Sequence, residues 1–294
     1  MSTNANLHKA KDAKNDEFYT QLTDVSKELM HYKQHFKDKT ILCNCDDPTL
    51  SAFWKYFLLN FSALGLKKLI STHYDKTQPT YKMEYTGGND NDIEVGVKTT
   101  LEGNGDFRNQ ECLDILDEAD IVVTNPPFSL FREYVAVLME HEKKFLIIGN
   151  KNAITYKEFF PLLKDNKVWL GYTNVKEFLQ PGGSIKKFGN VGWFTNLDVA
   201  KRHEKLILWK HYTTEEYPKY DGYDGIEVGH VADIPIDYNG VMGVPITFLD
   251  KYNPEQFEIV GLDRYTVPKE FLVGGRVAIN GKSKYARILI RKRG

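Results

Sequence analysis

Hydrophobic positions along the first 175 residues switch repeatedly between helical spacing and the short apolar runs that are typical of buried strands. Apolar runs predict strands at residues 39–45, 67–72, 120–124, 144–149 and 168–171. Helical spacing predicts helices at residues 16–36, 49–64, 110–119, 130–141 and 155–164. Because alternating strands and helices are joined by right-handed crossovers, we expect an α/β fold with a mostly parallel central sheet and helices on both faces.

Two segments depart from this alternation. Residues 78–105 are rich in Gly and Asn and alternate at Ile93, Val95 and Val97, which predicts an inserted hairpin. After about residue 175 helical spacing fades, and strands are predicted within residues 184–195, with residues 192–194 buried, at 205–209 and within 278–293. We therefore expect a core of residues 1–175 and a smaller, mixed C-terminal region of residues 176–294, with a soft boundary.

Composition narrows the class of protein. The chain has 294 residues, and its 41% of hydrophobic residues is enough for a sizeable core. The net charge of -1 argues against a protein that coats polyanions by bulk charge. The three cysteines form no disulfide framework and lack matched histidines, so we expect a reducing compartment and no metal site. Since no secretory or membrane-spanning apolar run is visible, we expect a soluble, cytoplasmic protein.

The motif with the clearest chemistry is Asn125-Pro126-Pro127-Phe128, which directly follows the β-branched run at 120–124. Two consecutive prolines fix two φ angles and predict a stiff, extended turn at the end of a strand. There the Asn125 side-chain oxygen and the Pro126 carbonyl can accept both hydrogens of an exocyclic amine, and Phe128 can stack on the heterocycle. The simpler alternative is a turn with a capping Asn and a core Phe, but the α/β context favours function.

Further segments accompany this turn in a fixed order along the chain. They are residues 16–20 (Asp-Glu-Phe-Tyr-Thr), 43–48 (Cys-Asn-Cys-Asp-Asp-Pro), 105–108 (Gly-Asp-Phe-Arg), 124–131 (Thr-Asn-Pro-Pro-Phe-Ser-Leu-Phe) and 192–196 (Gly-Trp-Phe-Thr-Asn). Together they resemble the S-adenosylmethionine-dependent, adenine-specific DNA methyltransferases of the EcoRI type, over most of the chain. The resemblance implies a Rossmann-like class I methyltransferase fold and methyl transfer to the 6-amino group of an adenine flipped out of duplex DNA.

The resemblance also implies which residues bind the cofactor, S-adenosyl-L-methionine. It places Phe18, Tyr19 and Thr20 over the methionine end of the cofactor, although locally they also fit a hydrophobic staple and helix cap. The loop at residues 44–48 takes the place of the first cofactor loop, and Asp46 is our preferred partner for the ammonium group. A solvated Asp-Asp-Pro turn that caps the next helix is the competing interpretation.

Three further residues complete the expected cofactor site. Asp75 is the acid nearest the end of the second strand, where such folds hold ribose hydroxyls. By the resemblance, Asp106 accepts a hydrogen bond from the adenine amine of the cofactor, and Phe107 covers the ring. The alternative for this pair is a Gly-Asp turn ahead of a helix, with a packed Phe.

The resemblance implies duplex DNA as the partner, within a restriction-modification system. An endonuclease would share the recognition site without contacting this chain, which we expect to be a monomer without a membrane partner. Residues 176–294 would complete the sheet and recognise DNA. Alternation within the basic end of the chain places Arg287, Leu289 and Arg291 on one strand face, which can contact phosphates, although a basic tail is more often simply solvated.

Two other functions remain open from the sequence. An RNA adenine methyltransferase would use the same Asn-Pro-Pro-Phe motif, so the motif alone does not separate RNA from DNA. A non-catalytic DNA-binding module of the same fold is suggested by the first cofactor loop, which has none of the glycines common in nucleotide-binding methyltransferases. The intact motif for a target amine argues against the second alternative.

Overall fold

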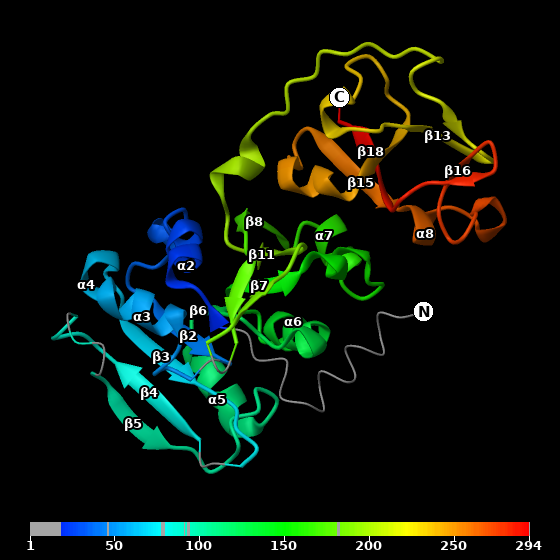
Figure 1. The fold of residues 1–294 in the computed structure, drawn as a ribbon. Coiled ribbons are helices and arrows are strands. Elements are labelled where there is room, and N and C mark those ends of the chain that lie inside the picture. The colour runs from blue at the N-terminus through cyan, green and yellow to red at the C-terminus, as the bar shows by residue number, and fades with distance from the viewer. Residues whose placement is uncertain are drawn as a thin grey trace. The chain divides into compact units, whose positions relative to one another are not determined.

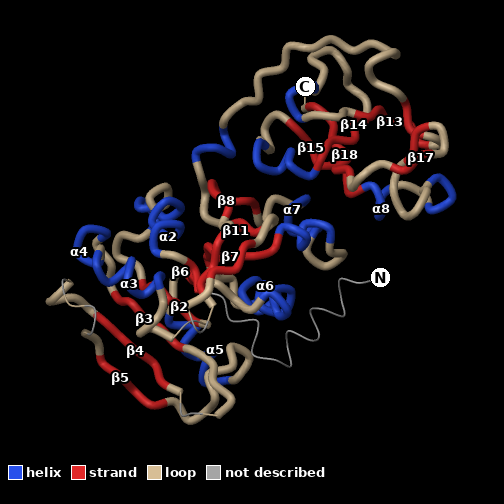
Figure 2. The backbone as a smooth tube through the Cα atoms, in the orientation of Figure 1, coloured by secondary structure: helices blue, strands red, loops and turns tan. Residues whose placement is uncertain are grey.

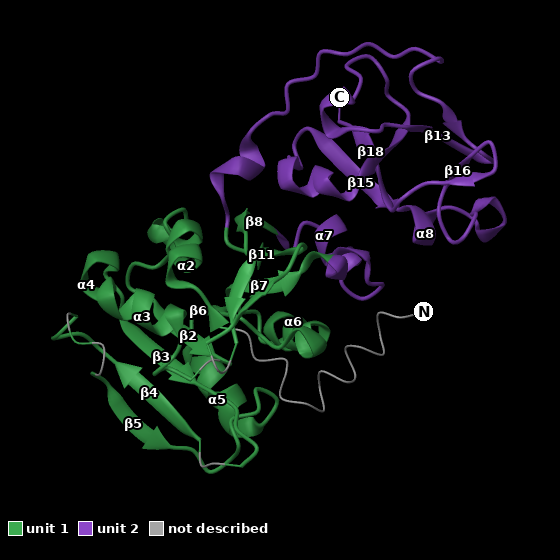
Figure 3. Cartoon of the chain, viewed as in Figure 1, with its two compact units in different colours: residues 1–151, 170–197 green, residues 152–169, 198–294 purple. Residues whose placement is uncertain are grey.

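A computed structural model describes residues 19–45, 47–77, 80–90, 92, 95–180 and 183–293. The chain forms two compact units, one of residues 1–151 and 170–197 and the other of residues 152–169 and 198–294 (Figure 3). Among the described residues, no helix is long and apolar enough to cross a membrane. The same residues contain no group of three or more His, Cys, Asp or Glu side chains placed to hold a metal ion.

The first unit is an α/β structure (Figures 1 and 2). Its helices are α2 (Leu22–Leu29), α3 (Ala52–Leu59), α4 (Phe61–Leu64), α5 (Gln110–Glu118) and α6 (Phe131–Glu140), with 3₁₀ helices η1 (Lys33–His35) and η2 (Phe128–Leu130). Its strands are β1 (Tyr19–Thr20), β2 (Thr40–Asn44), β3 (Lys68–Thr72), β4 (Tyr81–Tyr85), β5 (Val97–Thr100), β6 (Ile121–Thr124), β7 (Lys144–Asn150), β8 (Trp169–Asn174), β9 (Glu177–Leu179), β10 (Ile185–Lys187) and β11 (Val191–Thr195).

Eight of these strands form one sheet in the order β5-β4-β3-β2-β6-β7-β11-β8. The neighbours β3, β2, β6 and β7 run parallel, whereas β4 is antiparallel to β3, β5 to β4 and β11 to β7. The predicted α/β class and the predicted hairpin are confirmed, but the sheet is mixed rather than mostly parallel. The short link from β3 to β4 permits only an antiparallel pair, since a parallel crossover needs a dozen or more residues.

Helices cover both faces of this sheet, as predicted. The ring of Phe53 in α3 lies 6.0 Å from that of Trp193, and the ring of Phe131 in α6 lies 5.2 Å from that of Phe194. Consecutive residues of a strand point to opposite faces, so α3 and α6 lie on opposite sides of β11, in agreement with Figure 1. Both β11 aromatics are fully buried, which confirms the buried segment predicted at residues 192–194.

The predicted start and stop signals of the helical segment at residues 49–64 agree with the ends of α3 and α4. The Ser51 hydroxyl accepts a hydrogen bond from the Trp54 N–H at 3.3 Å and caps α3, and Gly65 ends α4 with φ 64°.

The helix predicted over residues 16–36 is shorter than expected. Residues 19 and 20 are a strand instead, because Tyr19 and Thr20 pair with Leu179 and Phe178 of β9, a partner distant in sequence.

The second unit is a mixed region. Its helices are α7 (Phe160–Lys164), α8 (Asp263–Thr266) and the 3₁₀ helices η4 (Ala200–His203), η5 (Val231–Asp233), η6 (Ile246–Lys251) and η7 (Lys269–Phe271), with η3 (Lys151–Thr155) at its start. Its strands are β12 (Lys219–Tyr220), β13 (Tyr223–Glu227), β14 (Val241–Pro245), β15 (Phe257–Leu262), β16 (Ala278–Ile279), β17 (Lys282–Ser283) and β18 (Arg287–Lys292). Five of them form a sheet in the order β12-β13-β14-β18-β15.

Two expectations for this unit are wrong. Residues 205–209 form no strand, and Ile207 and Trp209 are 83% and 64% exposed, because the backbone of Leu206 pairs with the side chain of Gln256 instead of a neighbouring strand. Arg287 does not lie on an exposed, phosphate-binding face, because its side chain is buried in an ion pair with Glu227 of β13. The Arg287 guanidinium lies 2.5 Å from a Glu227 carboxylate oxygen.

Candidate active site

The Asn-Pro-Pro-Phe turn follows β6, between the parallel neighbours β2 and β7. Asn125 and Pro126 are buried, while Pro127 and Phe128 are half-buried. Pro127 has φ -54° and ψ 126°, the extended conformation expected of the turn. The Thr124 hydroxyl donates a hydrogen bond to the Asn44 carbonyl, so the ends of β6 and β2 are tied together. The structure thus holds this turn at the carboxyl ends of adjacent parallel strands, where such sheets bind ligands.

A buried aromatic group links the same strand ends to the segment before α5. The Tyr134 hydroxyl, on α6, donates a hydrogen bond to the Asn44 side-chain oxygen, and the Phe107 ring meets the Tyr134 ring at 5.0 Å, edge to face. Burial raises the pKa of Tyr134 well above its ordinary value, which keeps this phenol a neutral donor. Phe107 is therefore placed beside the end of β2.

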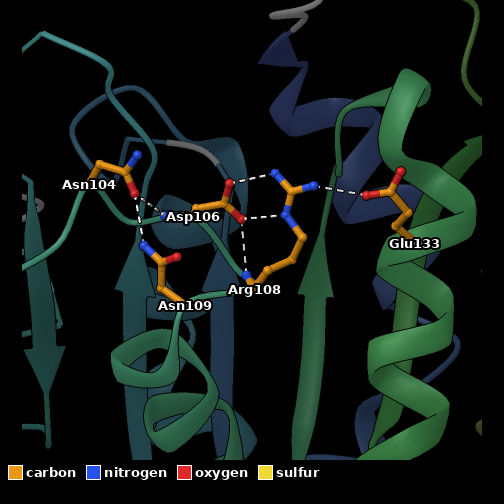
Figure 4. A network of polar contacts seen from close by, with 5 residues as sticks. All are labelled: Asn104, Asp106, Arg108, Asn109 and Glu133. Atoms are coloured by element: carbon orange, nitrogen blue, oxygen red, sulfur yellow. Dashed lines mark hydrogen bonds and ion pairs between the residues drawn. The ribbon is translucent and has the colours of Figure 1, made fainter.

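Asp106 lies at the centre of the polar network in Figure 4. Its Oδ1 accepts hydrogen bonds from the backbone N–H and Nε of Arg108 at 3.0 and 2.9 Å, and its Oδ2 accepts one from Nη2 at 2.6 Å. The Arg108 side chain holds the pKa of this carboxyl below its usual range. Arg108 also donates to Glu133 on α6 at 2.9 Å, so the network joins the segment before α5 to α6.

The loop after β2 takes an unusual backbone conformation. Cys45 has φ 94°, a region that favours glycine, and its N–H donates a hydrogen bond to the Thr72 carbonyl at 3.1 Å. The Asp47 carboxylate accepts hydrogen bonds from the Thr49 hydroxyl at 2.6 Å and the Tyr81 hydroxyl at 2.9 Å. These contacts make Asp47 part of the loop scaffold. Asp46, the expected ammonium ligand, lies outside the described residues.

The segment after β3 packs closely on the segment that carries Asp106. The Asp75 N–H donates to the Asn104 carbonyl at 3.2 Å, and the Asp75 carboxylate accepts from the Thr77 N–H at 2.7 Å. Gly105 has φ 73°, and a Cβ there would lie 1.9 Å from the His73 carbonyl oxygen. Only glycine allows this close approach, so Gly105 fixes the distance between the two segments that carry Asp75 and Asp106.

Strand β1 reaches the Asn-Pro-Pro-Phe turn through a small sheet of β1, β9 and β10. Thr20 is paired with Phe178, whose ring lies 6.1 Å from that of Phe128. The Thr20 hydroxyl is buried and has no hydrogen-bond partner among the described residues. Tyr19 and Thr20 are therefore near the turn, while Phe18 lies outside the described part of the chain.

Some residues of this site were missed by the sequence analysis. The Phe188 ring lies 5.8 Å from that of Phe128 and 5.4 Å from that of Phe178, so three aromatic rings meet at the turn. The Gln-Pro-Gly-Gly-Ser segment at 180–184, with Phe178 before it and Phe188 after it, was a signal of a hairpin that brings the two rings together. Tyr134 has no such signal, because its position fits an ordinary core residue of a helix.

Comparisons with known proteins bear on the family of this chain. Residues 6–293 match the family described as adenine-specific methyltransferase EcoRI. The chain is 47% identical to the type II methyltransferase M.EcoRI of Escherichia coli, over 99% of this chain and 98% of that protein. It is 38% identical to M.MgeORF184P of Mycoplasma genitalium and 36% identical to M.MpnI of Mycoplasma pneumoniae, both type II methyltransferases, over at least 97% of each chain.

No solved structure matches the chain significantly. The resemblance inferred from the ordered motifs is nevertheless confirmed by sequence over nearly the full length, and with it the predicted enzyme class. The chain therefore belongs to the EcoRI family of adenine-specific methyltransferases.

Proposed function

We propose that this enzyme transfers a methyl group from S-adenosyl-L-methionine to the 6-amino nitrogen of an adenine flipped out of duplex DNA, as the modification enzyme of a type II restriction-modification system. The observation that carries this proposal is the position of Asn125 and Pro126 at the carboxyl end of β6, tied to the end of β2 by the Thr124 hydroxyl. Members of the family are adenine-specific, and the relatives named above are type II methyltransferases.

The strand order supports a Rossmann-like class I methyltransferase core in the first unit. From the neighbours β2 and β6, the chain moves outward in opposite directions, to β3 on one side and to β7 on the other. This reversal is a topological switch point, where open α/β sheets bind ligands outside the carboxyl ends of their strands. The loops after β2 and β6 are the two loops of the proposed site, and they flank that point.

The residues around this point fit S-adenosyl-L-methionine. The buried Thr20 hydroxyl has no partner among the described residues, which is costly unless a ligand satisfies it. A carboxylate offers about four acceptor positions, and Arg108 occupies three of those of Asp106, which leaves one for an adenine amine. We assign cofactor binding to Tyr19, Thr20, Asp75, Asp106 and Phe107, together with Phe18 and Asp46. When bound, the cofactor supplies a methyl carbon that is electrophilic because it is attached to a sulfonium.

The chain's own residues orient the amine. The lone pair of an adenine amino group is delocalised into the ring, so the amine is a poor nucleophile. Acceptance of its two hydrogens by the Asn125 side-chain oxygen and the Pro126 carbonyl favours a pyramidal nitrogen with its lone pair directed at the methyl carbon. Phe128, held edge to face by Phe178 and Phe188, stacks on the base.

Methyl transfer then needs alignment rather than a covalent enzyme intermediate. The bound cofactor would supply the methyl group to the amine nitrogen that Asn125 and Pro126 orient, and the spare proton of the methylated amine would pass to water. Flipping the base costs a few kcal/mol, on the order of one lost stacking and pairing interaction, and contacts with the turn offset this cost. Because the methylated amine is strongly acidic, no dedicated base is required.

The wider assignments follow from the same proposal. Residues 1–175 would hold the catalytic core, and residues 176–294 would complete the sheet and recognise DNA. The enzyme would act as a monomer in the bacterial cytoplasm, where a cognate endonuclease would share its recognition site without contacting it.

An Asn125→Ala variant tests the mechanism. We expect label transfer from radioactive cofactor to duplex DNA to fall at least about 100-fold, as when one preorganised polar contact to a reacting group is removed. Cofactor binding measured by calorimetry should persist, because Asn125 holds the target amine. The exposed Asn89→Ala variant is the matched control and should retain full activity.

Other outcomes of this experiment are equally informative. Undiminished label transfer by Asn125→Ala would contradict the assigned role. Transfer to structured RNA but not to duplex DNA would favour the RNA enzyme. DNA binding without any cofactor binding by the wild-type protein would identify a non-catalytic module.

A further inference from the structure

The small sheet of β1, β9 and β10 has two rows of side chains with different surroundings. Thr20, Phe178 and Lys186 are register partners in one row, and Tyr19, Leu179 and Ile185 are partners in the other. Since neighbouring positions of a strand point to opposite faces, the two rows lie on opposite sides of the sheet. We call the row of Phe178 the inner row and the row of Leu179 the outer row.

The inner row attaches the sheet to the catalytic turn. Phe178 is fully buried, and its ring is 6.1 Å from that of Phe128. Phe188, directly after β10, completes the aromatic contact with Phe128 at 5.8 Å. The hairpin of β9 and β10 therefore has a fixed position beside the residue that we assign to stacking on the target base.

The outer row presents apolar side chains to the surface. Leu179 and Ile185 are 40% and 55% exposed and lie directly opposite each other on neighbouring strands. Exposed apolar residues that adjoin one another on a surface are often part of a binding site. Here they adjoin the proposed active site through the same two strands.

The charge of the hairpin favours a polyanion as the molecule bound there. Lys176, Lys186 and Lys187 are exposed, and Glu177 is the single acidic residue in the described part of residues 176–188. The Lys187 ammonium lies 3.0 Å from Glu177, but its side chain is 78% exposed, so this pair is weak in water. Three lysines against one glutamate give the hairpin a local positive charge, whereas the whole chain has a net charge of -1.

We propose that this hairpin is a DNA-binding surface beside the flipped adenine, which rests on the DNA methyltransferase function proposed above. Lys187, on the same side of the sheet as Ile185, and Lys186, on the opposite side next to the ring of Phe188, bind backbone phosphates at the two sides of this strand. Leu179 and Ile185 pack against the sugars and base faces that lose their stacking partner when the adenine leaves the helix, as apolar wedges do in other DNA-binding proteins. The surface thus couples DNA binding to base flipping at the position of Phe128.

The phosphate contacts are tested with the double variant Lys186→Gln/Lys187→Gln. The DNA dissociation constant of the full-length protein is measured from 50 to 200 mM salt with a duplex that contains the site mapped by methylation sequencing. We expect weaker binding and a reduction of about 1–2 in the slope of log K against log salt, because each phosphate contact contributes about 0.9. Cofactor affinity by calorimetry should not change.

The matched control is Lys33→Gln/Lys37→Gln, which removes two exposed lysines from η1 and the residue after its C-cap. It makes the same charge change outside the small sheet, so its salt slope should equal that of the wild type. Equal affinities and slopes for both double variants would overturn the phosphate contacts.

The apolar row is tested with Leu179→Ser/Ile185→Ser and a duplex with 2-aminopurine at the target adenine. We expect the fluorescence increase that reports the flipped base to fall several-fold, while the melting temperature stays near the wild-type value because both side chains are exposed. Met30→Ser/Leu59→Ser, which removes two apolar residues of similar exposure, is the control.

The result for the wild type separates this inference from the proposed function. If the wild type methylates the duplex but both sets of hairpin variants bind and flip as it does, the hairpin surface alone is wrong. If the wild type methylates no DNA, the proposed function fails first.

Discussion

Cys45 holds a backbone conformation that few residues other than glycine adopt. With φ 94° it lies in a region that costs a non-glycine residue about 1–3 kcal/mol. Its N–H is bonded to Thr72 at the end of β3, which holds the conformation in place. The loop after β2, which we propose as the first cofactor loop, thus has the turn that glycine commonly provides, although its sequence has no glycine, and the loop sequence alone did not reveal this.

A Cys45→Gly variant is predicted to be more stable. Relief of strain exceeds the extra conformational entropy that glycine gains on unfolding, so we expect the free energy of unfolding to rise by about 1 kcal/mol. Thermal unfolding measures the change. Cys112→Gly is the control, and we expect it to lower the free energy of unfolding. Cys112 is buried in α5, where a helical glycine and the loss of side-chain packing both destabilise the fold. A lower melting temperature for Cys45→Gly would show that the loop is not strained.

At the scale of elements, one buried carboxylate attaches α2 to β8. Glu28 is fully buried and accepts hydrogen bonds from the Tyr32 hydroxyl at 2.8 Å, the Tyr172 N–H at 2.7 Å and the Thr173 N–H and hydroxyl at 2.7 Å each. A Cβ at Gly171 would lie 2.3 Å from a Glu28 oxygen, so glycine is required there. Since α2 directly follows β1, this contact also helps to position Tyr19 and Thr20, to which we assign cofactor binding.

Glu28→Gln is predicted to destabilise the fold. The glutamine side chain would place an NH₂ group against N–H and O–H donors that now bond to the Glu28 carboxylate. Because those buried donors lose their acceptor, we expect the free energy of unfolding to fall by about 2–3 kcal/mol. Urea denaturation measures the loss, and the exposed Glu140→Gln on α6 serves as the control. Equal midpoints for the two variants would mean that the Glu28 contacts add nothing to stability.

Element prediction from sequence succeeded where periodicity and burial agree. The strands β2, β3, β6 and β7 follow apolar runs that are buried in the structure. Prediction failed for residues 205–209, where the run is apolar but no strand lies beside it. Burial decides whether such a run becomes a strand, and burial depends on residues distant in sequence.

At the scale of the whole molecule, carboxylates determine the response to acid. Hydrogen bonds and nearby cations outweigh burial and hold the pKa of seven described carboxyls below its ordinary value; these are Asp47, Glu84, Asp90, Asp106, Asp117, Asp198 and Asp237. Burial raises the pKa of Asp24 and Asp263, which act in the opposite direction. The carboxyls with a lowered pKa outnumber those with a raised pKa, so they determine whether acid lowers or raises the stability of the fold.

We therefore predict acid lability. A lowered pKa in the folded state adds stability above the unfolded value, near pH 4, and this stability is lost as the pH falls through the folded value. The melting temperature should be nearly constant from pH 5 to 7 and fall by on the order of 5 °C or more by pH 3. A melting temperature that rises on acidification would contradict this balance of charges.

The sequence by itself determined the α/β class, the order of the main elements and the family, and it supplied the hypothesis for the chemistry of the Asn-Pro-Pro-Phe turn. These depend on local periodicity, on the fixed φ of proline and on motifs that are contiguous in the chain. Only the tertiary structure decided that Phe178 and Phe188 surround Phe128, that Cys45 takes a glycine-like conformation and that Arg287 is buried against Glu227. Each of these depends on which distant segments become neighbours, and the free energy of that packing is absent from the local pattern.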